Sequence, residues 1–342
     1  MIWLEFVVCT TLILISGSLL SRYGNILSET TGMGRTWIGL ILLGTVTSLP
    51  ELATGLSAVT VADVPEIAVG DVLGSCVFNL MLIGLMDWFY RPGPILSHVD
   101  QGHILLGGFG VLLIGTGGTG LFLGSQNISS EMGWMGLYSP LIFILWVVAV
   151  RKIFSHEKNR MKGLNPSKVL NPKSLDQEIG VNLLIYPKVF LNAGVIIAAG
   201  MWLPYIGNRI SEVTGWGDTF VGTLLVAAST SLPEIVTSFS ALRLGAPDLA
   251  VANLLGSNLF NMAVLSLDDF AYLKGPLLSH VSFTHLISVF SALMMTGVCI
   301  VGVLFRAPKK ELGFLSWEGF ALMILYIFNA LILFYFSNMG IS

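Results

Sequence analysis

The sequence predicts an all-α membrane protein in which ten transmembrane helices form two inverted five-helix repeats. Three observations support this prediction: the composition, the recurrence of long apolar segments, and an internal repeat. Of the 342 residues, 54% are hydrophobic and only 11% are charged, whereas a soluble domain carries roughly 25% charged residues. The chain therefore lacks the polar side chains needed to cover a folded surface in water, which excludes a water-soluble enzyme.

The charges and cysteines exclude further classes of protein. The formal net charge is −3, so the chain has no basic surface of the kind that binds nucleic acid. The three cysteines, Cys9, Cys76 and Cys299, lie far apart within apolar segments and indicate neither a disulfide framework nor a zinc site. No GxxxxGK[ST] phosphate loop is present. We expect no cofactor and no ATP-driven pump.

Long apolar segments recur ten times, and each approaches or exceeds the ~20 residues that a helix needs to cross a bilayer. The first segment lacks the basic start and the cleavage site of a signal peptide, so we interpret it as a helix. The predicted spans are 2–21, 36–60, 66–90, 102–124, 134–153, 181–205, 218–242, 248–273, 283–305 and 316–337. The chain thus divides into a first repeat (1–153), a polar linker (154–180) and a second repeat (181–342).

The distribution of Lys and Arg predicts the orientation of these spans. With both termini outside, the inner loops hold 15 of the 17 basic residues, and the outer loops hold only Arg209 and Lys274. Basic residues concentrate on the cytoplasmic side of membrane proteins. We therefore expect an integral protein of the plasma membrane, with both termini outside and the linker 154–180 in the cytoplasm.

The two repeats are copies of one another. Gly24–Glu51 aligns without gaps on Gly207–Glu234 with 15 of 28 positions identical, and Pro65–Val99 aligns on Pro247–Val281 with 17 of 35 identical. Sequence identity at about half of the aligned positions indicates a duplicated unit. Because each unit holds five spans, an odd number, the second copy must enter the membrane upside down. Inverted repeats are typical of secondary transporters, whose substrate site lies at the midplane where the repeats meet.

Each copy carries the motif TSLPE deep within a long span, at 47–51 and at 230–234. A proline inside a helix removes a backbone donor and disturbs the carbonyl four residues earlier, so Pro50 and Pro233 predict two helix breaks. Carbonyl, hydroxyl and carboxylate oxygens gathered at such a break suit Ca²⁺ or Na⁺. Glu51 and Glu234 together carry a charge of −2, which matches one divalent cation. The neighbouring hydroxyls belong to Thr47, Ser48, Thr230 and Ser231.

A second polar set lies in the third and eighth spans. Asp71, Ser75 and Asn79 are four residues apart, so they share one face of the helix. The second copy repeats this face with Asn253, Ser257 and Asn261. A polar stripe in an apolar span must face the protein interior, where it serves either an ion site or hydrogen bonds between helices.

A duplicated structural bundle with harmless proline kinks would also explain the repeat. The ionisable groups argue against that reading, because a charge at membrane depth costs at least ~2.5 kcal/mol. Asp87 and Asp269, near the ends of their spans, are expected to be solvated helix caps. His98 and His280 have no neighbouring Cys or His, so we expect interfacial residues rather than metal ligands.

Together these residues resemble the sodium/calcium exchanger family of the cation/Ca²⁺ antiporters. That family carries two inverted repeats, each with a GTSLPE helix break and a GNxxGSNxxN helix. The present chain reads VTSLPE with GDVLGSCVFN, and STSLPE with ANLLGSNLFN. The resemblance implies an antiporter and no enzyme activity. Its implied partners are Ca²⁺, Na⁺ and the lipid bilayer, and no protein partner can be inferred.

The resemblance also implies a role for each motif residue. The two glutamates would coordinate Ca²⁺ and share in Na⁺ binding, and the two motif threonines would help hold Ca²⁺. The implied Na⁺ ligands are Ser48, Ser75, Ser231 and Ser257, with carbonyls near Gly44 and Ala227 assisting. Asn79 and Asn261 would lie at the centre, between the ion positions.

The implied mechanism is alternating access, in which Ca²⁺ or Na⁺ compensates the glutamates in turn. An empty site with two charges is too costly to move across the membrane, and this cost enforces exchange. The first and sixth spans, which have no ionisable residue in their middles, would be the sliding gate helices.

The chain departs from the family pattern at several positions. Val46 and Ser229 replace the glycine before TSLPE, Cys76 replaces an Asn, and Asp71 stands where Asn is usual. These departures leave the counter-ion open, so a Ca²⁺/H⁺ or other monovalent-cation antiporter is the alternative. We expect Asp71 to be uncharged and hydrogen-bonded to a neighbouring helix, with proton coupling as the competing interpretation. A cation channel and an intramembrane aspartyl protease are further, less favoured alternatives.

Overall fold

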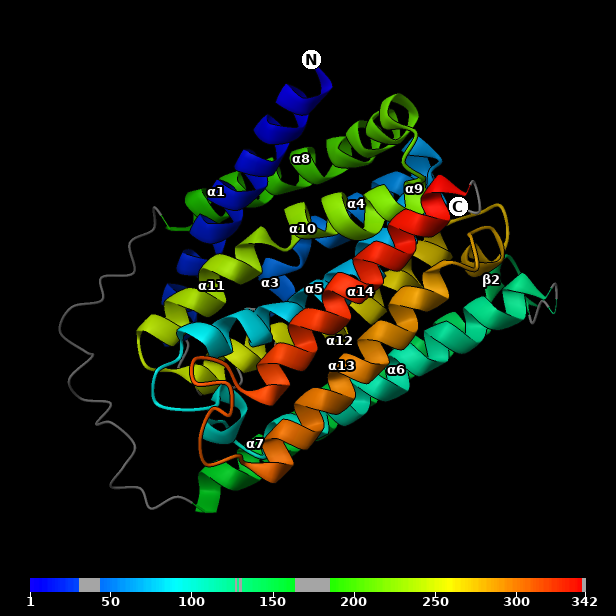
Figure 1. The fold of residues 1–342 in the computed structure, drawn as a ribbon. Coiled ribbons are helices and arrows are strands. Elements are labelled where there is room, and N and C mark those ends of the chain that lie inside the picture. Colours follow the sequence, from blue (N-terminus) through cyan, green and yellow to red (C-terminus); the bar gives the residue numbers. More distant parts are fainter. Residues whose placement is uncertain (31–43, 127, 129–130, 164–184, 340–342) are drawn as a thin grey trace.

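The computed structural model describes residues 1–30, 44–126, 128, 131–163 and 185–339, and these residues are almost entirely helical (Figure 1). The first half contains α1 (Ile2–Thr30), α3 (Gly44–Thr47), α4 (Leu49–Ser57), η2 (Ala58–Ala62), α5 (Pro65–Phe89), η3 (Ile95–His98), α6 (Gly102–Ser125), the antiparallel pair β1 (Glu131–Met132) and β2 (Met135–Gly136), and α7 (Tyr138–Gly163). The second half contains α8 (Ile185–Thr214), α9 (Asp218–Phe220), η6 (Val221–Val226), α10 (Ala227–Thr230), α11 (Leu232–Arg243), α12 (Pro247–Ala271), η7 (Leu277–Ser279), α13 (His285–Phe305) and α14 (Trp317–Asn338).

Eight of the helices in the described residues are long and apolar enough to cross a membrane. They correspond to eight of the ten predicted spans. The predicted seventh span is a pair of helical segments, Asp218–Thr230 and Leu232–Arg243, that bend by 47° at their junction. The predicted second span, 36–60, begins on residues outside the described ranges, and its described part contains a shorter apolar helix, Leu49–Ala62. Residues 164–184, which include most of the predicted linker, also lie outside the described ranges.

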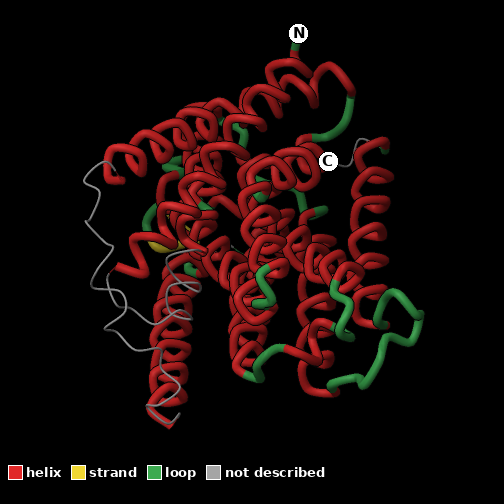
Figure 2. Tube along the Cα trace, turned by 90° about the vertical axis from the view of Figure 1, so that its left-hand side faces the viewer, coloured by secondary structure: helices red, strands yellow, loops and turns green. Residues whose placement is uncertain are grey.

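The helices α5 and α12 form the centre of the molecule and pack against each other. In each of them 89% of the most apolar 18-residue segment is buried, the largest share among the eight candidate spans of the described residues. Helices α1 and α8 lie side by side at one edge of the bundle, and α6, α7, α13 and α14 cover the opposite side (Figures 1 and 2). Since α5 and α12 carry the predicted polar stripes, those stripes lie at the most protected place in the fold.

Small residues allow the two halves to approach closely around α5. A Cβ atom added to Gly74 would lie 2.2 Å from the carbonyl oxygen of Thr223 in η6. No side chain fits in that distance, so the glycine lets η6 of the second half lie directly on α5 of the first. The π-helical form of η6 and of η2 was not predicted from the sequence.

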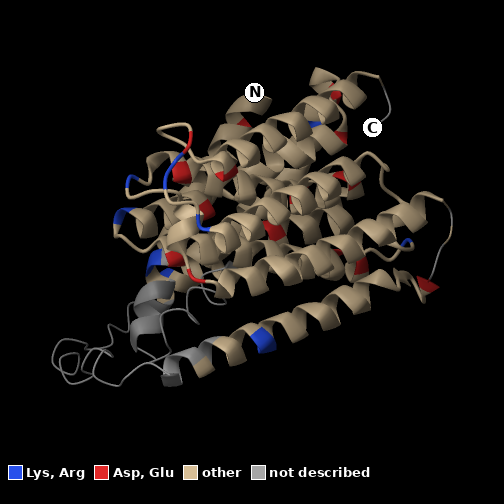
Figure 3. Ribbon diagram, turned by 60° about the horizontal axis from the view of Figure 1, so that its bottom comes forward, with Lys and Arg blue, Asp and Glu red and all other residues tan. Residues whose placement is uncertain are grey.

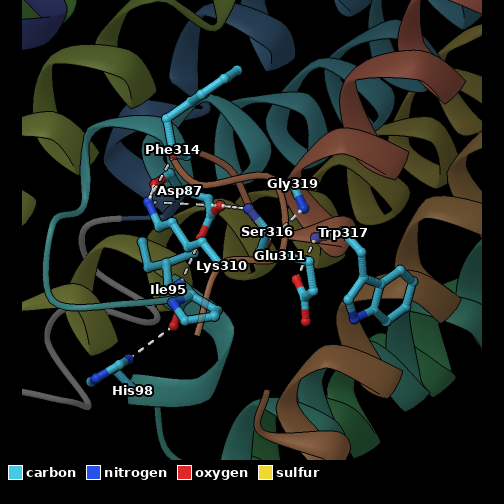
Figure 4. Close-up of polar contacts among 10 residues, drawn as sticks. Asp87, Ile95, His98, Lys310, Glu311, Phe314, Ser316, Trp317 and Gly319 are labelled. Carbon is cyan, nitrogen blue, oxygen red and sulfur yellow. Dashed lines mark hydrogen bonds and ion pairs between the residues drawn. The ribbon is translucent and has the colours of Figure 1, made fainter. Parts of the chain in front are cut away.

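Asp87, at the end of α5, is a buried cap rather than the solvated one predicted. Its carboxylate accepts hydrogen bonds from the backbone N–H of Ile95 at 2.7 Å and of Ser316 at 2.8 Å, and its side chain is 1% exposed (Figure 4). Lys310 approaches it, with Nζ 4.0 Å from Oδ2. Burial lowers the pKa of Lys310, and the charge of Asp87 opposes that change. The carboxylate thus ties the end of α5 to the α13–α14 connection.

Asp269, the repeat equivalent at the end of α12, is also buried and used in the same way. It accepts a hydrogen bond from the backbone N–H of Leu277 at 2.6 Å, eight residues later, as Asp87 does from Ile95. Its remaining contacts come from the first half of the chain: the N–H of Gly136 and the hydroxyls of Tyr138 and Ser139. The prediction of solvated caps was wrong because these partners are distant in sequence.

The two repeated histidines have local structural contacts. His98 Nδ1 lies 2.9 Å from the carbonyl oxygen of Pro94, and His280 Nδ1 lies 2.9 Å from that of Pro276. Among the described residues, no group of three or more His, Cys, Asp or Glu side chains is arranged to hold a metal ion. Both histidines therefore stabilise the turns that follow α5 and α12.

Candidate ion-binding site

Both TSLPE motifs form helix breaks at the serine of the motif. Ser48 separates α3 from α4 with φ −87° and ψ 14°, and Ser231 separates α10 from α11 with φ −83° and ψ 9°. Pro50 and Pro233 follow in the first turn of the next helix. The sequence placed these prolines inside one helix. The break instead precedes them, because a proline is tolerated in a first turn, where its missing N–H would have no acceptor within the helix.

Each break also places a glutamate at the start of a helix. Glu51 and Glu234 lie in the first turns of α4 and α11, and both side chains are fully buried. The N-terminus of a helix carries partial positive charge. Each glutamate therefore lies beside the partially positive start of its own helix.

The two breaks face each other and exchange hydrogen bonds between the repeats. The Ser48 hydroxyl donates to Glu234 Oε1 at 3.2 Å, and the Ser231 hydroxyl donates to Glu51 Oε1 at 3.2 Å. Each glutamate is therefore held by the serine of the other repeat. The structure brings the two motifs into one site, although they are 183 residues apart in the chain.

The serines of the two polar stripes join this site. Ser257 on α12 donates to Glu234 Oε1 at 3.3 Å and lies 3.4 Å from the Thr47 hydroxyl. On the opposite side, Ser75 on α5 accepts a hydrogen bond from Ser231 at 3.0 Å and lies 3.5 Å from the Thr230 hydroxyl. Each stripe serine thus contacts the TSLPE motif of the other repeat.

The asparagines Asn79 and Asn261 lie one turn further along α5 and α12, and both are fully buried. Asn79 donates through Nδ2 to Asn258 Oδ1 at 3.0 Å, and Asn258 in turn donates to the carbonyl oxygen of Cys76 at 3.0 Å. Asn258 was missed as a site residue. It occupies the position of Cys76 in the second repeat, and the asparagine of GSN was the available signal.

Several oxygens of this site have no hydrogen-bond donor in the described structure. They are Glu51 Oε2, Glu234 Oε2, Asn79 Oδ1 and Asn261 Oδ1. A buried acceptor without a partner costs ~1–3 kcal/mol, and none of the ion pairs among the described residues involves either glutamate. Carboxylate and amide oxygens with free lone pairs and no counter-charge form a set of hard ligands that a cation would satisfy.

Asp71 adjoins the site and is fully buried. The Thr230 hydroxyl donates to its Oδ1 at 2.8 Å, while Oδ2 has no partner in the described structure. The contact joins α5 to α10, as expected for an aspartate bonded to a neighbouring helix. Asn253, the repeat equivalent, bonds instead to Ser238 within its own repeat at 3.0 Å. The two stripes therefore differ at this position.

Comparison with known proteins identifies the family. The sequence profile of the family described as "Sodium/calcium exchanger protein" matches residues 1–164 and 189–335. The chain belongs to the sodium/calcium exchanger family. It is thus a transporter-type integral membrane protein.

Three similar proteins share between 18% and 28% of their aligned residues with this chain. The inner membrane protein YrbG of Escherichia coli (strain K12) is 28% identical over 270 residues, which cover 75% of this chain and 77% of that protein. The sodium/calcium exchanger MaX1 of Methanosarcina acetivorans is 27% identical over 336 residues, covering 90% and 91%. The solved structure of the sodium-calcium exchanger NCX_Mj aligns with a TM-score of 0.61 at 18% identity, covering 96% of this chain and 98% of that one. This structural likeness supports the same fold.

Proposed function

We propose that this member of the family is a secondary active antiporter that exchanges Ca²⁺ for Na⁺ by alternating access. The observation that carries the proposal is the pair of fully buried glutamates, each hydrogen-bonded by the serine of the other repeat. Each also has one carboxylate oxygen without a hydrogen-bond partner among the described residues. In this proposal Glu51 and Glu234 are the central ligands. The further ligands are Thr47, Ser48, Ser75, Asn79, Thr230, Ser231, Ser257 and Asn261.

Charge supports Ca²⁺ as one of the two ions. Two carboxylates carry −2, and Ca²⁺ takes six to eight oxygen ligands, which two glutamates alone do not supply. The hydroxyl and amide oxygens around them extend the donor set. When Ca²⁺ leaves, the two negative charges remain in a low-dielectric interior, so monovalent cations must enter before the site can move. Exchange, rather than leakage of one ion, follows from that requirement.

Alternating access also depends on the arrangement of the chain in the membrane. We propose ten spans in two inverted repeats, with the broken helices at the midplane. The beginning of α1 and the end of α14 lie toward the same end of the bundle (Figures 1 and 2), as an even number of spans requires. Most basic residues gather at one end (Figure 3), which favours a cytoplasmic location for that end in the plasma membrane.

A second candidate is a Ca²⁺/H⁺ antiporter. The buried carboxyl of Asp71, which among the described residues is hydrogen-bonded on one oxygen only, favours it, because acids within membrane spans relay protons. A cation channel using the same oxygens is less favoured, since broken helices from two halves are typical of transporters.

Uptake of radioactive calcium into proteoliposomes tests these candidates. Gradients of Na⁺, K⁺ or H⁺ are imposed one at a time, with the lipid and protein amounts unchanged. We expect an outward Na⁺ gradient to drive uptake, and a Glu51→Gln variant to serve as the inactive control. Uptake driven only by a proton gradient would replace this proposal with the second candidate. Calcium movement that needs no counter-ion would indicate a channel.

A further inference from the structure

Asp268 lies on α12, seven residues beyond Asn261, which is about 10 Å along a helix. Its side chain is fully buried, and neither carboxylate oxygen has a hydrogen-bond partner in the described structure. It is adjacent to Asp269, but the two differ completely, because Asp269 accepts four hydrogen bonds. The proposed exchange site does not use Asp268, and its burial requires a separate explanation.

The carboxyl group of Asp268 is seated against a glycine of α4. A Cβ atom added to Gly55 would lie 2.3 Å from Asp268 Oδ2 and 2.7 Å from Oδ1, so the carboxyl fills the space that a side chain would take. Thr54, the preceding residue, is fully buried and its hydroxyl also has no partner in the described structure. Gly55 is one helical turn beyond Glu51, so this position lies just to one side of the central site.

This position exists in one repeat only. In the alignment of the repeats, Met86 takes the place of Asp268, and Ser238 takes the place of Gly55. The first repeat therefore has neither the acid nor the space for it. Asp268 is not part of the duplicated ion site, and it makes the two sides of that site chemically different.

The charged groups around Asp268 do not neutralise it. The ionisable groups near it are acids as well: Asp71 on α5 and the adjacent Asp269. The segment η2 carries no titratable side chain, and Asp63 beyond it is exposed and paired with Lys274. An isolated carboxylate in such surroundings becomes neutral rather than remain charged. Its own oxygens and the Thr54 hydroxyl are too few to surround a metal cation, whereas a proton needs one oxygen.

We propose that Asp268 is a proton-binding site, separate from the ion site, that is protonated while α4 and α12 are in contact. Separation of α4 from α12 admits water from the side on which α12 ends, near the Asp63–Lys274 pair. The O–H bond of the carboxyl then breaks, the proton passes to water, and a carboxylate remains. The proton must return before the two helices can close again. Proton binding itself does not depend on the proposed function, but its effect on exchange does.

Infrared spectroscopy of the purified protein in lipid tests proton binding directly. We expect wild-type protein at neutral pH to show a carbonyl stretch of a protonated carboxyl that is lost in Asp268→Asn. Asp71→Asn is the matched control, because it removes a different buried acid and leaves the Asp268 signal in place. An Asp268→Asn spectrum identical to wild type in this region would overturn the proposal.

A second variant covers the case in which Asp268→Asn does not fold. Gly55→Ala places a methyl group where the carboxyl lies, so we expect the same infrared band to shift or disappear. An unchanged band in this variant would likewise overturn the proposal.

Calcium flux measured with pH varied on one side of the vesicle at a time tests the functional effect. We expect wild-type flux to depend on pH at the face near Lys274, and Asp268→Asn to lose that dependence without losing flux. Equal dependence on both faces, or no change in the variant, would contradict the one-sided release. If wild-type protein shows no exchange at all, the proposed function fails, while the infrared result still decides proton binding at Asp268.

Discussion

His285 Nε2, at the start of α13, donates a hydrogen bond to Glu66 Oε2, at the start of α5, over 2.8 Å. The contact joins the second half of the chain to the first. The equivalent pair in the repeat joins the halves with the roles exchanged. There the histidine comes from the first half and the acid from the second, with His103 Nε2 3.2 Å from Asp248 Oδ1. Each central helix is therefore held at its first turn by a histidine of the other repeat, which supports α5 and α12 as a fixed framework around the site.

The two histidine pairs differ in burial, and this difference gives a stability prediction. His285 is fully buried and Glu66 is 22% exposed, whereas Asp248 in the other pair is 56% exposed. We expect His285→Ala to reduce the free energy of unfolding by about 1–3 kcal/mol, because Glu66 Oε2 loses a buried donor and keeps only the Thr219 hydroxyl. His103→Ala is the matched control and should have a smaller effect. Thermal unfolding of both variants in the same lipid or detergent is the measurement, and equal losses would contradict the argument.

Neutralising either central glutamate should abolish calcium transport without preventing folding. Glu51→Gln and Glu234→Gln keep the shape of the side chain but remove one of the two charges that match a divalent ion. Asp63→Asn, an exposed acid paired with Lys274, is the control and should transport normally. Calcium uptake into proteoliposomes, with size-exclusion profiles to check folding, decides the matter. Robust calcium uptake by either Gln variant would show that the replaced glutamate is not an essential ligand.

Replacing Pro50 or Pro233 with Ala should weaken ion binding about tenfold, which corresponds to about 1.4 kcal/mol. An alanine supplies the N–H that proline lacks, so the helix can continue through the break and withdraw a carbonyl oxygen from the site. Pro65→Ala, at the first residue of α5, is the control because this proline lies outside both TSLPE motifs. Calorimetric titration with Ca²⁺ measures the affinity. Wild-type affinity in both variants would show that the breaks do not need the prolines.

Asp71→Asn should preserve sodium-driven calcium exchange. The hydrogen bond from Thr230 to Asp71 can be kept by an amide oxygen, and a third charge would over-compensate one Ca²⁺. We expect the variant to change mainly the dependence of exchange on pH. Flux is measured first under a Na⁺ gradient and then under a proton gradient. Loss of both fluxes would establish Asp71 as an essential ligand, and loss of the proton-driven flux alone would favour proton coupling.

The sequence was sufficient for those parts of the fold and site that depend on the repeat. TSLPE occurs twice at equivalent depth, so two facing breaks could be expected, and Ser48 and Ser231 do face the opposite glutamates. The position of each break could not be read from the proline, because a proline is compatible both with a kink and with a first turn. The burial of Asp87 was missed because Ser316, one of its partners, is 229 residues away.

Comparison of the repeats also hides residues that only one copy contains. Asp268 aligns with Met86, so a search for shared polar positions passes over it. Nothing in the local sequence distinguishes it from its neighbour Asp269. The structure distinguishes them: Asp269 accepts hydrogen bonds, whereas Asp268, packed against Gly55, has no hydrogen-bond partner among the described residues.

The exchange of serine–glutamate hydrogen bonds makes each half of the chain dependent on the other. A half expressed alone would bury a glutamate whose donor is absent, so it should not form the site by itself. Two identical halves, packed in opposite orientations, would satisfy both bonds, because every half carries a serine donor and a glutamate acceptor. Joining the halves in one chain removes the need for them to be identical. Each half is then free to acquire its own chemistry, as Asp268 opposite Met86 illustrates.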